Sequence, residues 1–252
     1  MPLESPSTFR KMTYQEEKVP EMVEDRFTKT CAVYQLGLVE YGKIYRLQKK
    51  LHRERLNGAI SDTLLLLEHP PTVTIGRSGS LDNVLVSREQ LTQEGISLFF
   101  IGRGGDVTYH GPGQLVGYPI MCLSERGEDI HRYVHDLEEV LIRTLKDFSI
   151  YANRDESHAG VWVDEEEVAA IGLSIRRWVT MHGFALNVNP NLKHFSLINP
   201  CGFSNRKATS MSQLLGRKLH MEEVNKCLVT NFSDVFGMTM EMGSSKAVRS
   251  EG

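Results

Sequence analysis

A cysteine near residue 200 stands in a setting that suits covalent chemistry. The run is Ile198-Asn199-Pro200-Cys201-Gly202, so the cysteine lies between a proline and a glycine. Such neighbours bend the backbone away from a helix interior, and we expect a more exposed thiol than that of a buried cysteine. A thiolate can take an acyl group from a thioester and pass it to an amine in two easier steps. From its position alone, a structural role is the more common one for such a cysteine.

A glycine-rich stretch from Gly102 to Ile120 is a second candidate. It reads G-R-G-G-D-V-T-Y-H-G-P-G-Q-L-V-G-Y-P-I. We expect a strand that enters and leaves a tight glycine corner, with backbone N–H groups available to a ligand. A purely structural hairpin is the alternative. The spacing matches neither a Walker loop nor a dinucleotide fingerprint.

Small residues mark a third segment, from Gly160 to Val188. We expect three successive strands at 160–163, 168–175 and 178–188. Ala169, Ala170 and Gly172 fall on the second of these strands, and Gly183 and Ala185 fall on the third. Two adjacent strands without bulky side chains form a slot that suits a linear acyl chain. Close packing against a helix would need the same small residues.

Alternating patterns and helical spacing predict the elements that position these segments. Further strands are expected at 31–38, 62–68, 72–75 and 96–101, and helices at 41–56, 87–91, 128–148 and 221–236. This order predicts an α+β fold, in which a mixed or antiparallel sheet carries packed helices. We expect one domain over residues 31–240, a flexible extension over 1–30 and a loose tail over 241–252.

Composition excludes several classes of protein. Hydrophobic residues make up 40% and charged residues 24% of the chain, as in soluble globular proteins. The net charge of −3 gives no attraction to nucleic acid, and no apolar run is long enough for a membrane helix. Four scattered cysteines without a C-x-x-C pair argue against a zinc site, and we expect reduced thiols in the cytoplasm. His131 and His135 are spaced as a metal pair but lack a third ligand, so we expect no metal.

The glycine-rich stretch resembles the signature of the octanoyltransferases of lipoate biosynthesis, the lipoyl(octanoyl) transferase B family. The pieces E-H-P-P, G-V-W-V, A-A-I-G, H-G-F-A-L-N-V and N-P-C-G extend the resemblance over roughly residues 31–240. It implies a single domain folded like the lipoate and biotin protein ligases. It also implies that Cys201 is the nucleophile that carries the acyl group.

The resemblance further implies the substrates. The donor would be octanoyl-acyl carrier protein, and the acceptor a specific lysine on apo lipoyl domains of 2-oxoacid dehydrogenases and on the glycine cleavage H protein. No ATP or other cofactor is implied, because the donor is already activated. The residues expected to bind substrate are Arg103, Gly104, Gly105, Asp106, Val107, Thr108, Tyr109, His110, Ala170, Ile171, Gly172, Gly183, Phe184 and Ala185. Backbone N–H groups of Gly104, Gly105 or Gly183 are expected as oxyanion donors.

One position departs from the family pattern. A lysine is expected 34 residues before the nucleophile, and this chain has Glu167 there. A carboxylate beside a thiol would oppose ionisation of that thiol. Three explanations are open. In the first, Glu167 points away and His158, His182 or His110 activates Cys201. In the second, Glu167 is itself a base for the incoming lysine, and in the third, the chain is a weakened or inactive relative.

Two other functions follow from these alternatives. The first is a binding protein of the same fold, which would hold a lipoyl domain or an acyl carrier without turnover. The second is an ATP-dependent lipoate or biotin ligase. The ligase would need a nucleotide-binding loop and a lysine for the acyl-adenylate, and the sequence provides neither.

Overall fold

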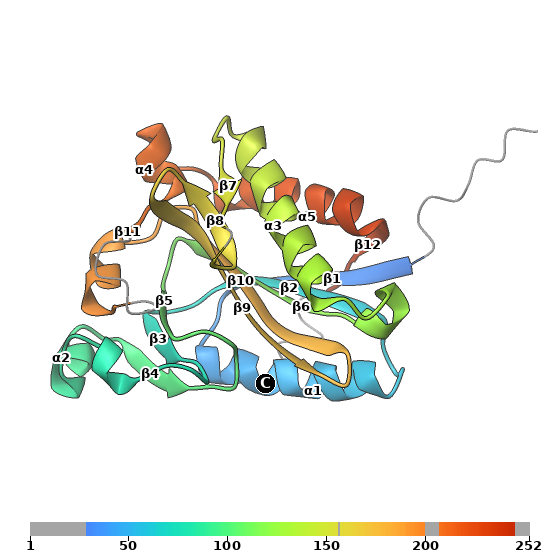
Figure 1. The fold of residues 1–252 in the computed structure, drawn as a ribbon, viewed down its shortest axis with the longest axis horizontal. Coiled ribbons are helices and arrows are strands. Elements are labelled where there is room, and N and C mark those ends of the chain that lie inside the picture. Colours follow the sequence, from blue (N-terminus) through green and yellow to red (C-terminus); the bar gives the residue numbers. More distant parts are fainter. Residues whose placement is uncertain (1–28, 156, 200–206, 245–252) are drawn as a thin grey trace, which may run out of the picture.

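A large mixed sheet forms the centre of the protein. In the computed structural model, residues 29–155, 157–199 and 207–244 are described, and the sheet has helices on both faces (Figure 1). The predicted nucleophile Cys201 lies outside these residues. Along the sheet the order is β12 (Met238–Met242), β1 (Lys29–Leu38), β2 (Asp62–Glu68), β6 (Gln114–Ile120), β10 (Val179–Asn187), β9 (Glu166–Arg176), β8 (Gly160–Val163) and β7 (Asn153–Arg154). A ninth strand, β11 (Lys207–Ala208), pairs with β9.

The alternation of side chains along β2 assigns the helices to the two faces. Leu64 and Leu66 pack into a core with α3 (Ile130–Asp147) and α5 (Met221–Phe236). Leu65 and Leu67 point the other way, into a core with α1 (Tyr41–Leu56). Successive side chains on a strand face opposite sides, so one continuous apolar run fills both cores. Figure 1 shows α1 below the sheet and α3 and α5 above it.

A small second sheet lies beside the large one. It contains β4 (Ser97–Phe100), β3 (Thr72–Ile75) and β5 (Val107–His110), in that order. Its core includes Val73, Ile75 and Tyr109, and α2 (Arg88–Gln93) adds Leu91. Short helical turns are η1 (Leu81–Asn83), η2 (Leu123–Arg126) and η3 (Leu192–Leu197), and α4 (Met211–Leu215) precedes α5.

The glycine corner connects these two sheets. Strand β5 pairs with β3, whereas β6 pairs with β2 and β10, so the strands on either side of the corner are not hairpin partners. Gly113 has φ of 87°, and a Cβ there would overlap the carbonyl group of Asn189. The corner therefore needs glycine to carry the chain from one sheet to the other.

The predicted fold class and the long elements are confirmed, with corrections at the ends. The expected tail from residue 241 begins inside β12, because Glu241 and Met242 pair in parallel with Ala32 and Val33 of β1. Strand β1 likewise begins at Lys29, inside the expected extension. The two-residue strands β7 and β11 were not predicted. No helix in the described part of the chain is long and apolar enough to cross a membrane.

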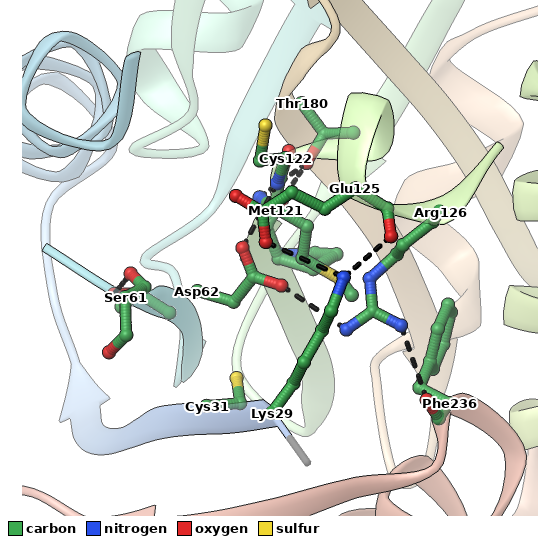
Figure 2. A network of polar contacts seen from close by, with 12 residues as sticks. Lys29, Cys31, Ser61, Asp62, Met121, Cys122, Glu125, Arg126, Thr180 and Phe236 are labelled. Carbon is green, nitrogen blue, oxygen red and sulfur yellow. Dashed lines mark hydrogen bonds and ion pairs between the residues drawn. The ribbon is translucent and has the colours of Figure 1, made fainter. Parts of the chain in front are cut away.

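A buried carboxylate holds together the ends of several elements. Asp62 at the start of β2 is 3% exposed, and its Oδ1 accepts hydrogen bonds from Arg55 Nε at 2.8 Å and Cys122 N at 3.0 Å. Its Oδ2 is 3.3 Å from Arg126 Nη2, whose guanidinium also donates to the carbonyl of Phe236 (Figure 2). The contacts join α1, β2, η2 and the end of α5.

Candidate functional site

A cavity of about 970 Å³ lies between the glycine-rich segment and strands β9 and β10. The residues that line it on these three sides are Arg103, Gly104, Gly105, Asp106, Val107, Thr108, Gln114, Glu167, Ala170, Ile171, Gly172, Leu173, Ala185 and Asn187. Other lining residues include Leu85, Ile130, Val134, Ser157, His158, Leu192, Phe195 and Lys207. Its size is that of a small-molecule pocket, and apolar side chains supply much of its wall.

The glycine-rich wall is held in place by its own polar contacts. Arg103 is 7% exposed, and its guanidinium donates to the carbonyl and hydroxyl oxygens of Thr74 at 2.8 and 3.0 Å. The carboxylate of Asp106 accepts a hydrogen bond from Val107 N at 2.7 Å. Gly104 N donates to Leu173 O at 2.7 Å, which fastens the segment to β9. Gly104 is therefore a poor oxyanion donor, because its N–H is already used. Gly105, with φ of 80°, stays a candidate.

Strands β9 and β10 give the opposite wall and lack bulk where they face each other. Their register pairs Ala170 with Ala185 and Gly172 with Gly183. A Cβ on Gly172 would lie 3.1 Å from Arg103 Cδ, so the small residue makes room for Arg103. A Cβ on Gly183 would overlap the carbonyl of Gly117 on β6. Gly183 is thus small because of strand packing, whereas Ala170 and Ala185 border the cavity itself.

A second, smaller chamber of about 50 Å³, the inner chamber, shares part of its lining with this cavity. It shares Arg103, Thr108, Ala170, Ile171, Gly172 and Ala185 with the main cavity and adds Tyr41, His110, Tyr118, His182, Gly183 and Phe184. His110 Nδ1 donates to Gln114 Oε1 at 2.8 Å. Neither ring nitrogen of His182 has a hydrogen-bond partner among the described residues. The chamber therefore brings the side chains of His110 and His182 beside the small residues of β9 and β10.

The histidines of this chamber are neutral at pH 7. Burial, together with the nearby His69, lowers the pKa of His110 to about 3. Burial, with the Arg103 guanidinium beside it, lowers the pKa of His182 to about 3. Burial also lowers the pKa of His69 to about 4. Weak bases of this kind are poorly suited to ionise a thiol at neutral pH, which disfavours His110 and His182 as activators of Cys201.

The expected substrate-binding residues fall into three groups. All except Tyr109, His110, Gly183 and Phe184 line the main cavity, and the last three of these line the inner chamber. Tyr109 borders neither. Its hydroxyl contacts His194 Nδ1 at 2.6 Å, and its ring packs against Phe195 in the core of the small sheet. Tyr109 therefore lies in the core of the small sheet rather than in the wall of the cavity.

Glu167 and a lysine from another strand border the same cavity. Lys207 on β11 pairs with Glu166, and Ala208 pairs with Glu167. The carboxylate oxygen Oε1 of Glu167 lies 3.1 Å from where a Cβ on Gly160 would be. The sequence pattern missed Lys207, because pairing between β11 and β9 brings it to the cavity from a distant part of the chain.

Comparisons with known proteins agree with this geometry. A family model described as the lipoyl protein ligase A/B catalytic domain matches residues 40–233. An octanoyltransferase of Caldicellulosiruptor saccharolyticus is 52% identical over 204 residues, which cover 80% of this chain and 87% of the relative. One from Desulforamulus reducens is 46% identical, covering 85% and 94%. A bi-partite lipoate protein ligase from Thermoplasma acidophilum has a similar fold, with a TM-score of 0.70 at 16% identity, covering 88% of this chain and 91% of that one.

Proposed function

Because the chain belongs to the octanoyltransferase family and is an acyltransferase, we propose that it modifies lipoyl domains in lipoate biosynthesis. In this proposal it transfers an octanoyl group from octanoyl-acyl carrier protein to one lysine of an apo lipoyl domain. Such domains occur in 2-oxoacid dehydrogenases and in the glycine cleavage H protein. The acyl group is carried between the two as a thioester on Cys201.

The observation that best supports this proposal is the apolar slot beside β9 and β10. Ala170 and Ala185 are paired on adjacent strands, and both line the cavity together with Thr108. A straight acyl chain fills such a space and gains about 0.8 kcal/mol for each buried CH₂ group. We therefore assign the slot to the octanoyl chain.

The reaction proceeds through two exchanges at one carbonyl carbon. The Cys201 thiolate attacks the donor thioester, a new carbon–sulfur bond forms, and the carrier leaves as its thiolate. The lysine amine then attacks the enzyme thioester, the amide bond forms, and Cys201 leaves as thiolate while the amine loses a proton. Both steps begin from an activated acyl group, so no ATP is consumed.

The experiment that tests the proposal mixes the protein with octanoyl-acyl carrier protein and an apo lipoyl domain. We expect one octanoyl group on one lysine of the lipoyl domain, identified by mass spectrometry of the intact domain and its peptides. Free octanoate with ATP, in place of the acyl carrier, should give no product. Product from free octanoate and ATP alone would favour a ligase instead.

Substituting Ala170 with leucine should shorten the acyl chain that the slot accepts. Leucine places three further carbons between β9 and the glycine-rich wall, and overfilling a packed space costs about 1–3 kcal/mol. We expect octanoyl transfer to fall roughly tenfold or more, with a smaller loss for hexanoyl transfer. The measurement is the ratio of kcat/KM for octanoyl and hexanoyl donors. Equal losses for both chains would contradict the assignment of the slot, and Ala59→Leu on the exposed surface is the control.

A further inference from the structure

His182 on β10 has a backbone conformation that is unusual for a residue in a strand. Its φ is 61°, in the left-handed region that non-glycine residues rarely adopt. Its backbone N–H donates at 2.9 Å to the side-chain oxygen of Gln48, a fully buried residue of α1. Strained residues of this kind persist where the surrounding structure fixes them, often beside a ligand. The imidazole of this fixed residue lines the inner chamber.

Two side chains of the inner chamber have buried polar atoms without partners. His182 and Tyr41 are each 2% exposed. Among the described residues, no hydrogen-bond partner reaches either ring nitrogen of His182 or the hydroxyl of Tyr41. Leaving a buried polar group unpaired costs stability, and the large majority of such groups in native proteins have a partner. These three atoms therefore indicate that the chamber binds a small polar ligand.

The hydrogen bonds around the chamber determine what that ligand must offer. Gln114 donates through its amide nitrogen to Asn187 Oδ1 at 2.9 Å, so its oxygen accepts from His110 Nδ1 at 2.8 Å. Because His110 is neutral, its Nε2 carries the lone pair and can only accept. The ring of Tyr41 lies 6.0 Å from that of His110, measured between centroids. The chamber thus offers an acceptor on His110, a hydroxyl donor on Tyr41 and one atom of each kind on His182.

The size of the chamber and its neutral histidines favour water as the ligand. A volume of about 50 Å³ has room for a small number of water molecules, whereas the main cavity has about 970 Å³. Water both donates and accepts hydrogen bonds, as these side chains require. A buried water also needs two to four polar partners, and the chamber provides them.

The inner chamber adjoins the slot that we assign to the acyl chain. Ala170 and Ala185 line both spaces. The main cavity reaches Leu85 and Ile130, which are 59% and 42% exposed, whereas no exposed residue in the described part of the chain lines the chamber. An octanoyl group stays bonded to a protein through its carbonyl carbon, so its methyl end must lead into the cavity. The methyl end is therefore the part of the chain that can reach the chamber.

We propose that the inner chamber binds water between Tyr41, His110 and His182, and that this hydrated chamber limits the length of the acyl chain. This role rests on the proposed function, which assigns the slot to an octanoyl group. A methyl end that entered the chamber would displace the water and leave the same polar atoms buried without partners. A chain longer than the slot therefore loses more than it gains from its additional apolar contacts. Tyr41 and His182 are specificity-determining residues.

The test measures the binding of fatty acids, because binding does not depend on turnover. Isothermal titration calorimetry gives Kd for octanoate and decanoate with the whole protein. In an apolar slot without a limit, two further CH₂ groups would tighten binding roughly 15-fold. We expect decanoate to bind the parent no more tightly than octanoate. Tyr41→Phe, which removes only the hydroxyl, and His182→Leu should each shift the ratio of the two Kd values roughly fivefold toward decanoate.

A crystal structure with octanoate supplies a second measurement. We expect ordered water within hydrogen-bond distance of the Tyr41 hydroxyl and of a ring nitrogen of His182, and an acyl chain that ends before this water. The matched control is Tyr45→Phe. The ring of Tyr45 lies 5.7 Å from that of His182, but Tyr45 does not line the chamber, so this variant should keep the parent's ratio.

Three results would overturn the proposal. They are decanoate that binds the parent roughly 15-fold more tightly than octanoate, an unchanged ratio in Tyr41→Phe, and a chamber that the acyl chain fills or that holds no water in the crystal. Tyr41→Phe alone decides the second result if His182→Leu does not fold. A parent that binds octanoate with this limit but transfers no octanoyl group would contradict the proposed function and not the limit. A parent that does not bind octanoate would remove the assignment of the slot, and this inference with it.

Discussion

Octanoyl transfer by Cys201→Ser is expected to fall at least about 1,000-fold, because a nucleophile has been removed. A serine hydroxyl is not ionised near neutral pH without a strong base, whereas a thiol is partly ionised. Any oxygen ester that formed on serine would also react more slowly with an amine than a thioester. The measurement is the rate of octanoyl-lysine formation on an apo lipoyl domain.

The matched control for this substitution is Cys227→Ser. Cys227 lies on α5, far from the glycine-rich segment in sequence, and it does not line the cavity. Its pKa is raised by burial and by the Asp147 carboxylate, which opposes thiolate formation. We expect Cys227→Ser to retain parent activity. Equal activity in Cys201→Ser and the parent would exclude the thioester on Cys201.

Asp62→Ala is expected to lower the free energy of unfolding by about 3–5 kcal/mol, because it leaves two guanidinium groups without their buried carboxylate. The side chains of Arg55 and Arg126 are only 10% and 17% exposed. Arg55 keeps its contact with Glu125 at 2.7 Å, and Arg126 keeps its contact with the carbonyl of Phe236 (Figure 2). Neither contact replaces the charge at the centre of the network.

The measurement is equilibrium unfolding in urea, with Asp234→Ala as the control. Asp234 is exposed on α5, and its removal should change stability by less than about 0.5 kcal/mol. In an Arg55→Met background, the loss caused by Asp62→Ala should be smaller, since one of the two partners is already gone. A loss below about 1 kcal/mol for Asp62→Ala alone would show that this carboxylate is not important for stability.

The sequence predicted long elements well where the hydrophobic pattern fits only one type of element, a strand or a helix. The apolar run at 62–68 became a strand buried on both faces, and the helical spacing after residue 128 became α3. It predicted less well where long-range pairing decides the structure. Strand β12 pairs in parallel with the edge of β1. The local sequence at 238–242 has no pattern that predicts this pairing.

The same distinction applies to the site. The small residues on β9 and β10 indicated a slot, and they do border the cavity through Ala170 and Ala185. No local pattern indicated that Asp155, Ser157 and His158 form one hydrogen-bonded group, because these contacts depend on backbone conformation rather than on spacing. Nor did it separate the buried histidines from His158. His110 and His182 are buried, whereas the side chain of His158 is 27% exposed, and local sequence does not record that difference.

The most direct test of the account is whether octanoyl-Cys201 forms and is consumed fast enough to be an intermediate. In a single turnover with octanoyl-acyl carrier protein, the account predicts an octanoyl group on the peptide that contains Cys201. After apo lipoyl domain is added, this adduct should decay at the rate at which octanoyl-lysine appears. Glu167→Lys should also form the adduct. Modified lipoyl domain that appears without a Cys201 adduct, or faster than the adduct decays, would contradict the account.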